Sequence, residues 1–235
     1  MRLLRWRPPG PYEAAFSTRQ GGVSEGPFAS LNLALRAGDA PDAVQENRRR
    51  LCAEMGADPE ALSLNRQKHT TLVHRAHRGR KGEPGDGLWT DEPGLPILAM
   101  GADCLTIALA RGNGDRPAAA VLHAGWRGLL EGIVVEAVAK LGGKHVAAAI
   151  GPAIGPCCYK VRADVAEPFA RRFGRDVVAE GKLDLWTAAD RALREAGAAS
   201  VERFDICTAC NPGLFFSERR MGRPRGTQGV IAVVG

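Results

Sequence analysis

Two side chains that bind soft metal ions occur at the ends of apolar segments. Cys104 lies between two apolar runs in GADCLTIALA, and His123 follows the apolar run AAAVL and precedes the turn AGWRG. We expect both at strand ends, where side chains from separate strands can converge at one edge of a sheet. His69, which precedes the extended stretch TTLVHRA, is a third candidate. Imidazole and thiolate both suit zinc, and three protein ligands leave a fourth position open for water or substrate.

Spacing alone leaves other interpretations open. The three residues come from separate segments, with no local ligand pair such as HExxH or a double CxxC around them. A histidine at a strand end is more often structural, and a lone cysteine is commonly a small core residue. A further alternative is a metal-free hydrolase, in which Cys104 is the nucleophile and His123 is its base.

The elements that must position these residues are both strands and helices. Capped, periodic segments predict helices, and buried apolar runs predict strands, with residues 96–110 forming either two strands or one strand broken at Gly101. Because strands and helices alternate only in places, we expect an α+β fold: mixed sheets in two layers, flanked by helices, in a single domain over residues 1–235. The strands are expected at 12–19, 96–110, 118–124, 145–151 and 229–235, and the helices at 41–56, 126–143, 162–174 and 185–197.

Residues 77–96 are the segment richest in glycine, proline and charge. This composition is typical of an exposed loop within a domain, and such a loop could cover a site.

The composition, 45% hydrophobic and 25% charged residues over 235 positions, is typical of a globular protein. We find no membrane-spanning run and no secretory h-region, so we expect a cytoplasmic protein with no membrane partner. The net charge is +6, but the arginines are scattered, and the densest group, at 47–52, is expected on the solvated face of a helix. We therefore expect no nucleic-acid partner.

Six cysteines in a cytoplasmic chain are expected to be reduced. We expect Cys157 and Cys158 to be packing residues. The lone CxxC formed by Cys207 and Cys210 is a weak signal, and a second metal site shared by the two pairs is the less favoured interpretation.

Five blocks occur in the same order as in a known bacterial family: STRQGGVSEGPFASLNL, GADCLTIAL, VLHAGWRGLLEGI, AIGPAIGPCCYKV and CTACNPGLFFSERR. Across residues 16–220 the chain resembles the laccase-domain proteins, long described as polyphenol oxidases. The resemblance implies mixed sheets flanked by helices, and a zinc ion held by His69, Cys104 and His123. The family's first histidine usually lies in Gln-Val-His-Gly, whereas this chain has Gln67, Lys68, His69 and Thr70, so His74 remains a possible substitute.

The resemblance also implies phosphorolysis of purine nucleosides (adenosine, inosine, guanosine, methylthioadenosine) and deamination of adenosine, so that a purine nucleoside and phosphate are the expected partners of a monomer or small homo-oligomer. Asp103 is the best-placed carboxylate for proton transfer, although it could instead cap the turn beside Cys104. Arg127, which opens a predicted helix, is expected to bind phosphate and to act in catalysis. Arg19 and Arg220 are further candidates for the anion. Asn32 could contact the base or cap a turn.

The metal is expected to be zinc rather than copper. A multicopper oxidase needs imidazoles for several coppers, and this chain has five histidines in all. We therefore expect any copper activity to reflect adventitious metal.

Overall fold

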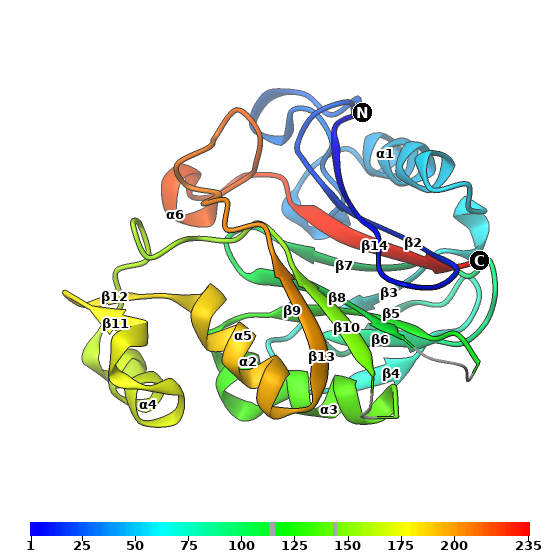
Figure 1. Cartoon of the computed structure of the whole chain (residues 1–235). Helices are drawn as coiled ribbons and strands as arrows, with labels where there is room; N and C mark the ends of the chain where they lie inside the picture. Colours follow the sequence, from blue (N-terminus) through cyan, green and yellow to red (C-terminus); the bar gives the residue numbers. More distant parts are fainter. Residues whose placement is uncertain (113–115, 143–144) are drawn as a thin grey trace.

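Two six-stranded mixed sheets pack face to face in the computed structural model, which describes residues 1–112, 116–142 and 145–235 (Figure 1). The first sheet has the order β1 (Leu3–Trp6), β2 (Tyr12–Ser17), β14 (Gln228–Val234), β7 (Ile97–Gly101), β3 (Ser63–Arg66) and β5 (Lys81–Pro84). The second has the order β13 (Ala198–Arg203), β10 (Val146–Ile150), β8 (Leu105–Arg111), β9 (Ala119–Ala124), β6 (Gly87–Thr90) and β4 (Val73–Arg75). A short hairpin pairs β11 (Val178–Ala179) with β12 (Lys182–Leu183).

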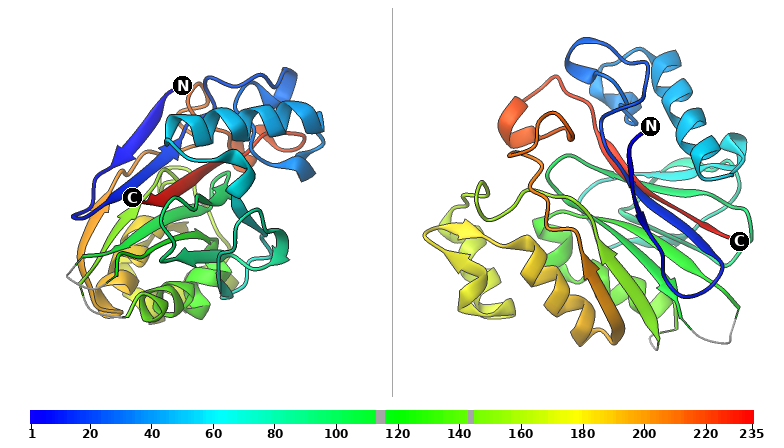
Figure 2. Two further views of the ribbon diagram at one scale, coloured as in Figure 1. Left: turned by 90° about the vertical axis from the view of Figure 1, so that its right-hand side faces the viewer. Right: turned by 45° about the horizontal axis from the view of Figure 1, so that its top comes forward.

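Helices cover the outer faces of both sheets (Figure 2). The first sheet is covered by α1 (Pro41–Glu54), whose buried side chains Leu51 and Cys52 join a core with Leu98 and Ile231. The second is covered by α2 (Trp126–Glu131), α3 (Ile133–Lys140) and α5 (Leu185–Glu195), while α4 (Ala163–Phe173) packs against α2 and α5, and α6 (Glu218–Met221) follows in the C-terminal part. The α+β prediction, with two sheet layers in a single domain, is confirmed.

The interface between the sheets is built from alternate residues of facing strands. Phe16 and Val230 of the first sheet pack with Ala108 and Val121 of the second, and each is at most 1% exposed. Many of the inward-facing residues are alanines, which lets the two sheets approach closely around the few large side chains.

Two predicted elements differ from the structure. The helix expected over 126–143 is broken at Gly132, whose φ of +100° ends α2 and starts α3. The exposed loop expected over 77–96 is only partly confirmed: residues 77–84 are mostly exposed, but the segment forms β5 and β6, and Asp86 between them is 1% exposed. β5 is a short strand at the edge of the first sheet, where glycines and charged residues are tolerated, whereas β6 lies between β9 and β4 in the second sheet.

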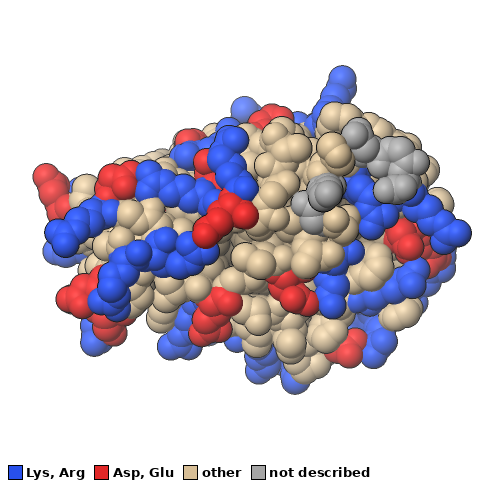
Figure 3. Space-filling model, turned by 60° about the horizontal axis from the view of Figure 1, so that its bottom comes forward, with Lys and Arg blue, Asp and Glu red and all other residues tan. Residues whose placement is uncertain are grey.

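The arginine-rich stretch 47–52 was predicted to lie on the solvated face of a helix, but the structure buries part of it. Arg48 is 7% exposed and donates from Nε and Nη2 to the Leu33 carbonyl, while Arg49 and Arg50 both pair with Glu46. On the face shown in Figure 3, Lys and Arg side chains are interspersed with Asp and Glu. None of the described helices is both long and apolar enough to cross a bilayer.

Candidate metal centre

His69, Cys104 and His123 meet at one edge of the second sheet. β8 begins directly after Cys104, and β9 runs antiparallel to it with Thr106 opposite His123, so Cys104 and His123 lie at the same edge. His69 reaches them from the loop between β3 and β4, where its φ is +60°. One ligand atom from each of the three lies within 4.8 Å of the others, and Cys104 Sγ is 3.9 Å from His69 Nε2.

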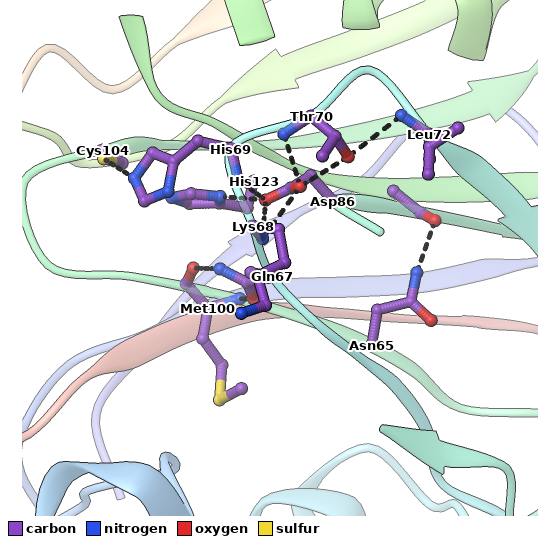
Figure 4. Close-up of polar contacts among 11 residues, drawn as sticks. Asn65, Gln67, Lys68, His69, Thr70, Leu72, Asp86, Met100, Cys104 and His123 are labelled. Carbon is purple, nitrogen blue, oxygen red and sulfur yellow. Dashed lines mark hydrogen bonds and ion pairs between the residues drawn. The ribbon is translucent and has the colours of Figure 1, made fainter. Parts of the chain in front are cut away.

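Asp86 connects the two histidines (Figure 4). Its carboxylate lies 2.8 Å from Nδ1 of His123 and accepts the backbone N–H groups of Lys68, His69 and Thr70. The Thr70 hydroxyl donates to it as well, at 2.8 Å, and the Asp86 carbonyl accepts the His123 backbone N–H. Nδ1–H of His123 donates to the Asp86 carboxylate, so Nε2 is the ring nitrogen that can bind a metal ion, which is the arrangement that orients histidines at metal sites.

The charges in this group stabilise the ionised form of each partner. Burial raises the pKa of Cys104, but His123 and His69 outweigh it and lower that pKa to about 6. Burial lowers the pKa of His123, but Cys104 and Asp86 outweigh it and raise that pKa to about 9. The pKa of Asp86 is depressed despite its burial, because His123 and the N–H of Thr70 donate to it. Near neutral pH the Cys104 thiolate therefore lies beside a protonated His123, and a metal ion that binds His123 would displace a proton from its ring.

Gly125 leaves the space that these side chains occupy. A Cβ atom at this position would lie 2.7 Å from Cδ2 of His69 and 3.3 Å from Sγ of Cys104. Any larger residue at position 125 would therefore push the His69 ring or the Cys104 thiol out of place, so the turn after His123 requires glycine.

Comparison with known proteins identifies the family. The family model described as "Multi-copper polyphenol oxidoreductase laccase" matches residues 13–234. The chain belongs to this family. A purine nucleoside phosphorylase of Pseudomonas aeruginosa is 36% identical over 228 residues, covering 93% of this chain and 92% of the relative. The purine nucleoside phosphorylase YfiH of Escherichia coli is 33% identical, covering 92% and 91%. The crystal structure of YlmD from Geobacillus stearothermophilus has a TM-score of 0.91 at 31% identity, covering 100% of this chain and 96% of that one.

The donor set of this laccase-family member fits a metal ion. Two imidazoles and a thiolate suit zinc, and the carboxylate of Asp86 supplies the outer partner that such histidines need. His74 is not part of the group, because its Nε2 lies 2.9 Å from the Pro84 carbonyl. Among the described residues, His69 and His123 are the histidines that cluster with a thiol, which leaves the imidazoles of a multicopper centre unaccounted for.

Asp103 directly precedes Cys104 in the sequence, and Arg127 lies four residues after His123. The Asp103 carboxylate accepts the Thr208 hydroxyl at 2.6 Å and the Arg219 backbone N–H at 2.7 Å. Its φ of +82° marks the tight turn before Cys104. Arg127 is exposed, with its guanidinium 4.9 Å from the ring centre of Trp126.

The remaining predicted site residues have different surroundings. Arg19 donates to the carbonyls of Ala29 and Pro212 and stacks on Phe216, so its guanidinium ties two loops together. Arg220 is exposed at α6. Asn32 is fully buried, and its amide bonds the Asp39 carboxylate and the backbone of Ala34 and Thr227, which is the turn-holding role of the two expected.

Asp86 and Gln67 are site residues that the sequence patterns did not predict. β6 pairs with β9 so that Gly87 lies opposite Leu122, and this register places Asp86 beside His123. Gln67 fixes the loop of His69 to β7 through two hydrogen bonds with the Met100 backbone, at 2.5 and 2.8 Å. The one sequence signal was the pair of glycines around Asp86 in PGDGL, which is weak by itself.

Proposed function

We propose that this protein is a zinc-dependent purine nucleoside phosphorylase that also deaminates adenosine. The observation that supports it best is the group of His69, Cys104 and His123, with Asp86 behind it, in which two imidazoles and a thiolate provide three donors of the kind zinc prefers. The names of the relatives supply the substrate class, with adenosine, inosine, guanosine and methylthioadenosine as proposed nucleosides.

His69, Cys104 and His123 would hold the zinc ion. When bound, zinc would supply a Lewis acid able to polarise a substrate oxygen or activate a water molecule. Asp86 fixes the ring orientation of His123 and the backbone of His69, so the ligands are positioned before any metal arrives.

Phosphorolysis breaks the bond between the ribose C1′ and the purine nitrogen, forms a bond from C1′ to a phosphate oxygen, and leaves the base with a proton. An anion must therefore be held near the nucleoside. Arg127 is the best-placed cation in the proposal, because it is exposed and lies four residues after His123. Arg220 is the second candidate, since its side chain is also exposed. Arg19 and Asn32 are proposed to shape the surrounding loops rather than to contact substrate.

We assign Asp103 a positioning role in place of proton transfer. Both of its carboxylate oxygens accept hydrogen bonds, one from Thr208 and one from Arg219, and these bonds hold the turn that presents Cys104.

The test is a product assay on metal-analysed protein. Adenosine and inosine are incubated with and without phosphate, and free base, ribose 1-phosphate and ammonia are measured. Base release that requires phosphate, ammonia release from adenosine, and loss of both in Cys104→Ser are expected. Cys52→Ala, a change at a buried thiol in α1, is the matched control. Zinc-loaded wild-type protein that releases neither base nor ammonia would overturn the proposal.

A metal-free hydrolase is the second candidate, acting on an amide such as a cell-wall peptide precursor. The observation in its favour is that the Cys104 thiol, the His123 imidazole and the Asp86 carboxylate lie in a row in space, with the imidazole in the middle. Cysteine hydrolases use the same order of groups. Iodoacetamide separates the candidates. A nucleophilic thiol is alkylated at once and activity is lost, whereas a zinc-bound thiolate reacts only after a chelator has removed the metal.

A further inference from the structure

Four cysteines gather at a second place in the molecule, away from His69 and His123. The Sγ atoms of Cys157, Cys158, Cys207 and Cys210 all lie within 4.8 Å of one another. Cys210 Sγ is 3.5 Å from that of Cys157 and 3.4 Å from that of Cys158. The prediction that Cys157 and Cys158 are ordinary packing residues does not account for this cluster, since Cys157 and Cys210 are both exposed.

The sheet topology brings the two pairs together. β10 and β13 are parallel neighbours, and the chain continues from both at the same edge of the second sheet. The continuations stay paired through a bridge between Ala153 and Cys207. Cys157 and Cys158 then lie in the turn after β10, and Cys207 and Cys210 in the turn after β13. The cluster is therefore held by backbone pairing on both sides.

The distances suit a shared cation better than a disulfide. A disulfide needs sulfurs about 2.05 Å apart. Four sulfurs bound tetrahedrally to one zinc ion at about 2.3 Å lie about 3.8 Å from each other, close to the spacing seen here. All six cysteines of the chain are free thiols in the structure.

The backbone around the cluster also favours a thiolate at Cys207. The N–H of Gly155 donates to Cys207 Sγ at 3.3 Å, and such bonds to sulfur stabilise its negative charge. Gly155 must be glycine, because a Cβ there would lie 2.5 Å from the Trp186 ring and 3.3 Å from Cys157 Sγ. Thiolates this close repel one another, and a divalent cation between them removes that repulsion.

We propose that Cys157, Cys158, Cys207 and Cys210 form a second, structural zinc site with four thiolate ligands. Four protein ligands leave no open position, so this site stabilises the fold and takes no part in chemistry. The exposure of Cys157 and Cys210 gives the ion a path from solvent.

The site would brace the turn that presents Cys104. Thr208, between the two cysteines of the CxxC, donates to the Asp103 carboxylate, and the N–H of Ile154 donates to the Asp103 carbonyl. Arg219 adds a third link, since its backbone N–H donates to Asp103 and its guanidinium donates to the Cys158 carbonyl. Loss of the zinc would therefore loosen two segments that hold Asp103.

Metal content of the purified protein tests the proposal. About two zinc ions per chain are expected in wild type and in Cys52→Ala, and about one in Cys104→Ser and in the double variant Cys157→Ser/Cys210→Ser. Cobalt-loaded wild type is expected to show thiolate charge-transfer absorption that falls roughly fivefold in the double variant, because four of its five thiolate ligands belong to this site. A double variant that retains the full zinc content would overturn the proposal.

A measurement on wild-type protein covers the case in which the double variant does not fold. Zinc-loaded protein is treated with iodoacetamide, and the mass of each cysteine-containing peptide is measured by mass spectrometry. Protection of Cys157 and Cys210, lost on adding a chelator, is expected despite their exposure. Prompt alkylation of these two thiols at saturating zinc, or a mass lower by two hydrogens that shows a disulfide between them, would overturn the proposal.

Discussion

Asp86 positions two ligands of the candidate metal centre with one carboxylate. It contacts the His123 ring directly and holds His69 through the backbone of residues 68–70. An asparagine at this position would present an NH₂ group to some of these N–H donors, so the arrangement could not be kept intact.

We therefore predict that Asp86→Asn weakens zinc binding by about 10- to 100-fold, as removal of an outer partner does at other zinc sites. Competition with a chelator of known affinity measures the change. Asp91→Asn is the matched control, because Asp91 lies in the same segment and pairs with Arg75 instead. Equal affinities in the two variants would contradict the prediction.

Gly125→Ala tests how tightly the ligands are packed. The new Cβ would displace the His69 ring or the Cys104 thiol. We therefore predict that kcat/KM for the proposed phosphorolysis falls by about 10- to 100-fold. Gly213→Ala should leave activity unchanged, because a Cβ at Gly213 meets nothing within 4 Å. Steady-state kinetics of both variants, at matched zinc content, decide the question.

Sequence reasoning located the ligands more easily than the residues that hold them. Cys104 and His123 border apolar strands, so their position at a sheet edge could be predicted from the pattern alone. His69 was already a candidate from the sequence, but its loop has no periodic signal, and the family resemblance was the stronger reason to choose it. Asp86 was out of reach, since its contact with His123 depends on the register between β6 and β9.

At the scale of elements, Gly132 separates two helices within one apolar run. Its φ of +100° lies in a region that residues with a Cβ rarely adopt, although no atom would contact a Cβ there. The sequence predicts one helix because apolar residues continue on both sides, and a single glycine in a helix is usually tolerated.

Gly132→Ala tests whether the break at Gly132 is built into the fold or whether α2 and α3 can join into one helix. If the break is built into the fold, we predict a loss of about 1–2 kcal/mol in the free energy of unfolding, from forcing alanine into a left-handed conformation. Urea denaturation measures the loss, with Gly213→Ala for comparison. A more stable alanine variant would mean that α2 and α3 join into one helix.

At the scale of the whole molecule, the packing between the two sheets rests on few large side chains. Phe16 is 1% exposed, packs edge-on against Phe204 with ring centres 5.2 Å apart, and fills the space that a Cβ at Gly151 would need. The sequence predicted a strand over 12–19, but it could not show that the layer facing Phe16 is a second sheet.

We predict that Phe16→Ala lowers the free energy of unfolding by about 3–5 kcal/mol, because the cavity between two rigid sheets cannot collapse. Phe28→Ala, at a half-buried residue, should cost distinctly less. Chemical denaturation of both variants provides the comparison, and similar losses would show that the sheets adjust to fill the gap.

The place of β14 in the first sheet has a consequence for how the chain folds. This strand lies between β2 and β7, and it pairs with β2 across more than 200 residues of intervening sequence. Contacts of such long range slow folding, because the entropy of a very large loop is lost before they form. During synthesis, β2 therefore keeps an unpaired edge until β14 emerges, and such edges are prone to aggregation.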